Sequence, residues 1–177
     1  MQLPTRVEWA AAAATALLLI LSFPNFELSF LAWIALVPLM WAVSRRPSPF
    51  SAFLLGWAAG TAFFYGSCYW LTYSMIHYGG LPTIVAYLLL IPGALVVGIF
   101  PGVFAFLLAL AVKKWGESAV LWAPVFWPAT EWARLAVTGQ LWNALGYSQA
   151  FHPTLIRPAV WGAVYAVGFV IVVINTA

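Results

Sequence analysis

The chain has 177 residues, of which 65% are hydrophobic and only 6% are charged, and its mean hydropathy is +0.99. Soluble globular domains carry roughly a quarter charged residues, so this composition excludes that class and indicates an integral membrane protein. The formal net charge of +3 rests on seven Lys and Arg residues, most of them between apolar runs, and it does not suggest a nucleic-acid partner.

The apolar runs are long and continuous, which favours membrane-spanning helices. We predict an all-α, polytopic membrane protein with one transmembrane domain over residues 1–177. It is a bundle of about six helices with a cytoplasmic N-terminus. The predicted helices lie near residues 9–23, 28–43, 50–74, 83–112, 118–137 and 158–175.

The first two predicted helices form a hairpin. Each arm has about 15 residues, or about 22 Å at 1.5 Å per residue, which is short of the roughly 30 Å hydrocarbon core. The arms therefore either span imperfectly or use their flanking residues. The basic start at Arg6 is like that of a secretory signal, but no small-residue cleavage site follows the run, so we expect a retained hairpin.

The third and fourth runs contain small and helix-breaking residues. Gly56 and Gly60 have a Gly-x-x-x-Gly spacing, which either lets a neighbouring helix approach closely or arises by chance. The fourth run, residues 83–112, is about 45 Å long if straight, too long for one upright helix. We expect Pro92 and Pro101 to kink or break it.

Six crossings with an internal N-terminus place five of the seven cations on the cytoplasmic side, as the positive-inside rule requires. The same count places the turn at His77, the loop at Trp142 and the short loop at Asn25 outside. Two cations, Arg134 and Arg157, flank the outer polar loop, where they need partners or a function. The five inner cations are Arg6, Arg45, Arg46, Lys113 and Lys114.

Glu131 and Arg134 are charged residues inside an otherwise apolar region. They are three residues apart, so on a helix they share a face and can pair. One interpretation is a structural ion pair that fixes the fifth helix. The other is functional: either Arg134 reaches an anionic head group, or the pair steadies the loop that follows.

The loop after Val137 concentrates aromatic and amide side chains at the predicted membrane surface. Trp142, Asn143, Tyr147 and Gln149 form either an aromatic belt or a shaped loop that meets lipid head groups.

The turn at His77 and Tyr78 offers either a general base or an interfacial hydrogen-bonding group. The single cysteine, Cys68, excludes a disulfide within the chain, and its segment supplies no base or metal to activate it. We expect an inert core thiol. His77 and His152 lack the spacing of metal ligands, so neither a metal nor another cofactor is predicted. The sequence also lacks a Gly-x-Ser-x-Gly elbow and a phosphate loop, which makes it a poor candidate for a complete enzyme.

Two neighbouring motifs carry a resemblance to a known family. They read Glu131-Trp132-x-Arg134 and Thr138-Gly139-x-x-Trp142-Asn143-x-x-Gly146-Tyr147-Ser148-Gln149, and they resemble the membrane domain of apolipoprotein N-acyltransferase. The stretches 21–26, 66–71 and 77–82 are also similar to parts of that family. The similarity covers essentially the whole chain, and the segment from Gly146 to Gln149 is its most specific part.

The resemblance implies a multi-pass protein of the bacterial inner membrane that takes part in lipoprotein maturation. Enzymes of the family transfer an acyl chain from a phospholipid, usually phosphatidylethanolamine, to the N-terminal cysteine of a diacylated apolipoprotein. They work through a thioester on the cysteine of a Glu-Lys-Cys set in a nitrilase-like module. In this chain we expect no catalytic residue. The residues expected to contact lipid or substrate are His77, Tyr78, Glu131, Arg134, Trp142, Asn143, Tyr147 and Gln149.

The sequence departs from the family pattern after its sixth apolar run, because a seventh helix, the nitrilase-like module and a last helix do not follow. We therefore expect a truncated product or one part of a split enzyme, inactive alone, whose catalytic module is a separate nitrilase-like subunit. One alternative is a small lipid-binding scaffold that docks such a subunit. Another is a transporter component, for which only Thr61, Ser67 and Thr72 are mid-membrane polar candidates.

Overall fold

The computed structural model describes residues 3–23, 26–45 and 48–177, and within these ranges the chain forms helices and no strands. The predicted all-α class is confirmed. Asn25 and Arg46, which entered the predicted orientation, lie outside the described residues. With η marking 3-10 helices, the elements are α1 (Arg6–Leu21), η1 (Ser29–Trp33), α2 (Val37–Arg45), α3 (Pro49–Ser67), α4 (Leu71–His77), α5 (Thr83–Trp115), η2 (Glu117–Trp122), α6 (Ala123–Thr138), η3 (Leu145–Gln149) and α7 (Ala159–Asn175).

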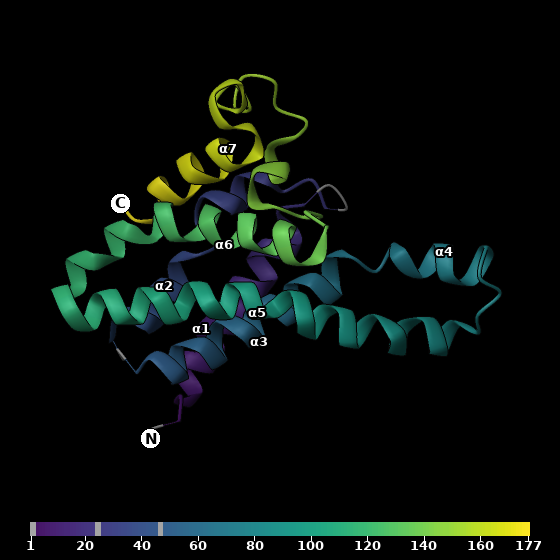
Figure 1. Ribbon diagram of the computed structural model, residues 1–177, viewed down its shortest axis with the longest axis horizontal. Helices are drawn as coiled ribbons and strands as arrows, with labels where there is room; N and C mark the ends of the chain where they lie inside the picture. Colours follow the sequence, from purple (N-terminus) through teal and green to yellow (C-terminus); the bar gives the residue numbers. More distant parts are fainter. Residues whose placement is uncertain (1–2, 24–25, 46–47) are drawn as a thin grey trace.

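The packing of α3 against α5 forms the centre of the molecule (Figure 1). A Cβ atom on Gly60 would lie 2.7 Å from Cγ of Pro101, and one on Gly56 would collide with the Pro101 carbonyl oxygen. From the other side, Gly98 of α5 lies directly against the backbone of Thr61. The two helices therefore meet backbone to backbone, which confirms the close approach predicted from the Gly-x-x-x-Gly spacing.

Helix α5 is continuous although Pro92 and Pro101 lie inside it, so of the predicted kink or break, the break does not occur. Prolines are tolerated in helices that neighbouring elements support, and here α3 packs along α5. Trp57 of α3 also bonds to α5, because its Nε1 donates to the Leu95 carbonyl at 2.9 Å. Among the described residues, α5 is the one helix long and apolar enough to cross a membrane by length and composition.

Three of the predicted runs are divided in the structure. Residues 28–43 form η1 and α2, residues 50–74 form α3 and α4, and residues 118–137 belong to η2 and α6. Helix α7 also contains a kink, because Gly162 and Ala163 have non-helical backbone angles. Each interruption leaves backbone N–H and C=O groups without their usual helical partners.

Buried polar side chains satisfy the backbone at the interruption between η1 and α2. Asn175 Oδ1 accepts from the Leu36 amide at 2.8 Å, and its Nδ2 donates to the carbonyl of Ala32 at 3.0 Å. Thr15 Oγ1 accepts from the Leu39 amide at 3.0 Å. These bonds connect the interrupted segment to α7 and α1. The backbone groups of Ala32, Leu36 and Leu39 at the interruption therefore have hydrogen-bond partners.

Helix α4 and the first turns of α5 form an arm that projects from the body of the molecule (Figure 1). Helix α4 ends at His77, and the turn that follows leads into Thr83 at the start of α5. The arm therefore carries the predicted His77 and Tyr78 pair away from the other helices.

The substitution Gly56→Ala should lower the stability of the fold by about 1–3 kcal/mol, because the new Cβ meets the fixed carbonyl oxygen of Pro101. The matched variant Gly93→Ala adds the same methyl group to α5, where nothing lies within 4 Å, and should not be destabilised. Thermal unfolding in detergent, followed by circular dichroism, measures both. Equal melting temperatures for the two variants would contradict the α3–α5 contact described.

The substitution Asn175→Ala should cost about 1–3 kcal/mol, because the buried Leu36 amide loses its acceptor. Thr176→Ala is the control, since its hydroxyl bonds only the exposed carbonyl of Val173. Denaturant unfolding compares the pair, and a Thr176→Ala variant as unstable as Asn175→Ala would rule out the assigned role.

Candidate functional site

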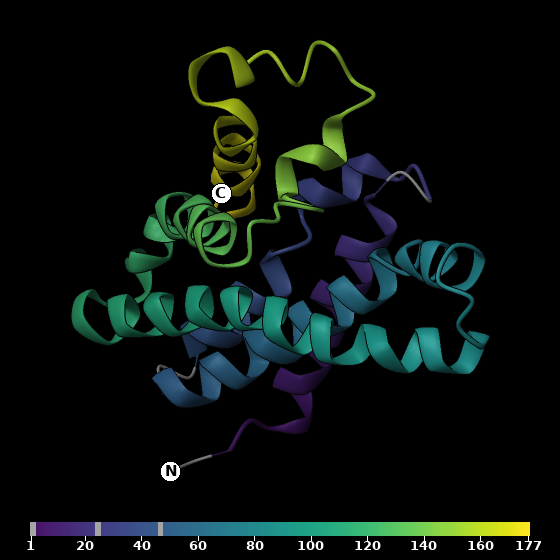
Figure 2. The same cartoon turned by 45° about the vertical axis from the view of Figure 1, so that its right-hand side comes forward.

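The segment that follows α6 is the centre of the candidate site. Gly139 ends α6 in the left-handed conformation, with φ of 68°, and the chain then turns back toward the ends of α3 and α4 before entering η3. Figure 2 shows η3 beside η1. We call residues 139–149 the return segment.

Glu131 of α6 holds the return segment through a hydrogen bond to its backbone. Its side chain is buried, with 5% exposed, and its Oε1 accepts a hydrogen bond from the Leu145 amide at 2.7 Å. The second oxygen, Oε2, is also buried and has no hydrogen-bond partner. Helix α7 covers it closely, because a Cβ on Gly168 would lie 3.5 Å from Oε2. This hydrogen bond fixes the start of η3.

Arg134 holds the same segment one turn further along α6. Its side chain is 3% exposed, and Nη1 donates to the Trp142 carbonyl at 2.6 Å. The guanidinium carbon lies 4.8 Å from the centre of the Phe64 ring, a cation–π contact that links α6 to α3. Nη2 is buried and has no hydrogen-bond partner.

Glu131 and Arg134 do not bond to each other, although they share a face of α6. The unpaired atoms Oε2 and Nη2 show that neither side chain completes an ion pair within the described part of the chain. Of the two interpretations that the sequence left open, a direct ion pair is therefore the one that the structure does not show. The alternative interpretation fits: each charge binds an opposite backbone dipole of the return segment, a donor for the carboxylate and an acceptor for the guanidinium.

Trp142 and Asn143 connect the return segment to the residues that follow α3. The ring of Trp142 meets that of Trp70 edge to face, with centroids 5.5 Å apart. Asn143 has a positive φ of 54°, a conformation that asparagine tolerates better than most residues, and its Nδ2 lies 3.5 Å from Sγ of Cys68. The structure thus brings both predicted residues together with Glu131 and Arg134.

Gln149 and Tyr147 have different surroundings. Gln149 is fully buried, and its Nε2 donates to the carbonyl of Ser29 at 2.9 Å. Close by, Ser29 Oγ lies 2.7 Å from Nε2 of His152. Gln149 therefore anchors η3 to η1, whereas Tyr147 remains half exposed beside Trp142.

His77 and Tyr78 do not join this group. The ring of His77 stacks on Tyr73, with centroids 3.9 Å apart, and Nδ1 lies 3.0 Å from the Tyr73 carbonyl oxygen. Tyr78 is 84% exposed. These residues form an aromatic cluster at the tip of the arm, so the predicted site residues fall into two separate groups.

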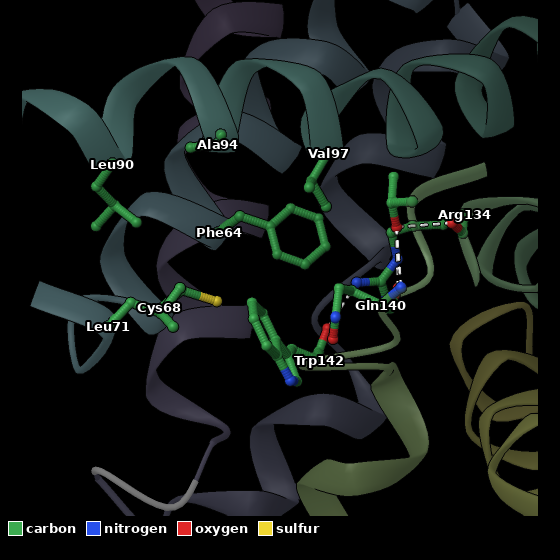
Figure 3. Close-up of a pocket in the computed structure, with 11 residues that line it drawn as sticks. Phe64, Cys68, Leu71, Leu90, Ala94, Val97, Arg134, Gln140 and Trp142 are labelled. Carbon is green, nitrogen blue, oxygen red and sulfur yellow. Dashed lines mark hydrogen bonds between the residues drawn. The ribbon is translucent and has the colours of Figure 1, made fainter. Parts of the chain in front are cut away.

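An apolar pocket of about 130 Å³ lies against Trp142, between α3, α4 and α5 (Figure 3). Its polar end is formed by Arg134 and Gln140, and its other end by residues such as Leu71 and Leu90. The lining residues are Phe64, Cys68, Leu71, Leu90, Gly93, Ala94, Val97, Arg134, Thr138, Gln140 and Trp142. Most of them could not be selected from the sequence, because apolar residues that face a cavity look the same as those that face lipid.

A wider depression of about 400 Å³ also lies against Trp142. Trp142 and Gln140 line both spaces, so the two lie next to each other. Within the described residues, no group of three or more His, Cys, Asp or Glu side chains is placed to hold a metal ion.

Comparison with known proteins gives a consistent result. A family model described as the apolipoprotein N-acyltransferase N-terminal domain matches residues 15–177. Proteins named apolipoprotein N-acyltransferase from Geobacter metallireducens, Chromobacterium violaceum and Coxiella burnetii are 36%, 29% and 30% identical to this chain, over 96%, 91% and 75% of its length. The same alignments cover 32%, 31% and 28% of the relatives. The chain therefore spans about a third of the length of the relatives it matches.

The substitution Glu131→Leu should raise the hydrogen-exchange rate of the Leu145 amide by about 5- to 150-fold, because the amide loses an acceptor worth about 1–3 kcal/mol. Glu131→Gln keeps an acceptor oxygen in place and should stay within about threefold of the parent rate. Hydrogen-exchange mass spectrometry of peptides covering residues 141–149 measures both, and unchanged exchange in Glu131→Leu would show that the carboxylate does not hold the segment.

Proposed function

Because the chain belongs to the apolipoprotein N-acyltransferase family, we propose that it is the lipid-holding membrane domain of an enzyme of that kind. The reaction is the transfer of an acyl chain from a phospholipid, with phosphatidylethanolamine as the expected donor, to a diacylated apolipoprotein. The role of this chain is to hold acyl chains at the outer face of the inner membrane.

The apolar pocket against Trp142 carries the proposal. Apolar side chains of α3, α4 and α5 line most of it, and Trp142 closes one side, which we call the roof. The bond between Arg134 and the Trp142 carbonyl holds Trp142 in place. Ligand sites are typically apolar cavities with a few placed polar groups, and this pocket has that character. The wider depression against Trp142 provides a second surface at the same place for a second lipid chain.

A multi-pass arrangement in the bilayer accounts for the outer surface of the fold. Large apolar side chains are exposed on several helices, with Val160 and Trp161 of α7 and Ile84 of α5 among the most exposed. Exposed apolar area on this scale needs an apolar surrounding. In this arrangement the return segment and the arm tip face outward, and Lys113 and Lys114 at the end of α5 face the cytoplasm.

The chemistry of transfer is assigned to residues outside this chain. Cys68 lines the pocket, and its sulfur receives a contact from the Asn143 amide, but none of the described His or Lys side chains hydrogen-bonds to it. A nucleophilic thiol needs such a base, and the guanidinium of Arg134 cannot act as one. We place catalysis in a nitrilase-like module, either joined to this domain or supplied as a separate subunit.

Photo-crosslinking tests the lipid-holding role. The chain, purified in detergent, is mixed with one equivalent of phosphatidylethanolamine that carries a diazirine on one acyl chain. Crosslinks should concentrate in residues 64–71, 90–97 and 134–142, because these segments form the pocket. Unlabelled phosphatidylethanolamine in excess is the control and should remove them. Crosslinks spread evenly over α7 and the other exposed apolar faces would contradict the proposal.

Acylation of a diacylated lipopeptide tests the assignment of catalysis. The purified chain in phosphatidylethanolamine vesicles should produce no N-acylated peptide above a protein-free control, whereas a complete enzyme of the family should do so. Multiple turnovers by this chain alone, retained in Cys68→Ser, would place catalytic residues elsewhere within it; turnovers lost in that variant would make Cys68 the nucleophile. Either result would overturn the assignment.

A further inference from the structure

Arg134 lines the pocket, and its guanidinium has a donor without a partner. The side chain is buried, Nη1 is engaged by the Trp142 carbonyl, and Nη2 has no partner. Arg134 is also the one charged residue among the described residues that line the pocket. A buried cationic donor left without an acceptor is unfavourable, so the site is suited to a ligand that brings an oxygen atom.

The shape of the pocket limits what that ligand is. Its volume of about 130 Å³ has room for roughly four groups the size of a water molecule. In Figure 3 the guanidinium and Gln140 lie at one end, and Leu71, Leu90 and Cys68 lie at the other. A fitting ligand therefore has an oxygen acceptor at one end and a short stretch of methylene groups directly after it.

We propose that Arg134 Nη2 donates a hydrogen bond to the carbonyl oxygen of an acyl group, whose first methylenes fill the space between Phe64 and Leu90. The rest of the acyl chain lies outside the pocket. This inference rests on the proposed lipid-holding function and makes it more specific: the site recognises the carbonyl and not merely the hydrocarbon. The same chemistry is offered by the ester of a phospholipid and by the carboxylate of a free fatty acid.

Cys68 provides a direct probe of occupancy. It is the single cysteine of the chain, and it lines the pocket. The rate of its alkylation by N-ethylmaleimide, measured by intact-protein mass spectrometry in detergent, should fall when a ligand fills the space. The probes are a diacyl phosphatidylethanolamine, its dialkyl ether analogue with identical chain length and head group, and palmitate.

The diacyl lipid should slow alkylation at least about tenfold at saturation, and the ether lipid, which lacks the carbonyl oxygens, less than about twofold. Slowing by palmitate alone would identify the carboxylate as the source of the same oxygen and would also support the proposal. Equal slowing by the ester and ether lipids would overturn carbonyl recognition while leaving the lipid-holding function intact. No slowing by any lipid would overturn both.

Two variants of α5 keep the test independent of Arg134, whose replacement also removes the bond to the Trp142 carbonyl. Gly93→Leu projects a side chain into the pocket, since a Cβ there meets nothing within 4 Å, and should abolish the effect of the diacyl lipid on the alkylation rate. Val96→Leu changes an exposed side chain outside the pocket and should keep the full effect. An undiminished lipid effect in Gly93→Leu would overturn the proposal.

Discussion

Glu131 and Arg134 are buried on one face of α6, where each needs a hydrogen-bond partner. Both find that partner in the backbone of the return segment. The carboxyl group of Glu131 accepts a hydrogen bond from the Leu145 amide, and the guanidinium of Arg134 donates one to the Trp142 carbonyl. Losing either bond is costly, because a buried polar group would be left without a partner. The path of the return segment, and with it the roof over the pocket, follows from these two contacts.

The same requirement explains features elsewhere in the fold. Interrupted helices leave backbone amides without an acceptor in an apolar interior. A single polar side chain supplies the acceptor, as Asn175 does for Leu36 and Thr15 does for Leu39. Where backbone groups are already paired, the helices meet through small residues, as at Gly56 in the contact between α3 and α5. Asn175 and Thr15 are thus placed where an interruption leaves backbone amides in need of a partner.

Some of this arrangement could be predicted from the sequence. Composition and continuous apolar runs indicated the helical class, and the density of polar groups after Val137 pointed to the segment that forms the roof. The Gly56 and Gly60 spacing predicted a close helix contact, because absence of a side chain has a direct geometric consequence. These successes rest on local patterns.

The misses involve partners that are distant in sequence. The spacing of Glu131 and Arg134 places them on one face but does not show that backbone groups up to fourteen residues away bind them instead. The prolines of α5 suggested a kink or a break, and the break does not occur. Nothing near Asn175 in the sequence indicates its role at η1. His77 and Gln149 looked alike as loop residues, but one lies on an exposed arm and the other is fully buried.

The account of function depends on the charges of α6 holding the return segment rather than each other. Solid-state NMR of the chain in lipid bilayers, with ¹³C in glutamate side chains and ¹⁵N in leucine amides and arginine side chains, measures this directly. The account predicts a strong dipolar coupling between the Glu131 carboxyl carbon and the Leu145 amide nitrogen, whose hydrogen bond is 2.7 Å long. A dominant coupling from Glu131 to the guanidinium nitrogens of Arg134, with none to Leu145, would contradict it.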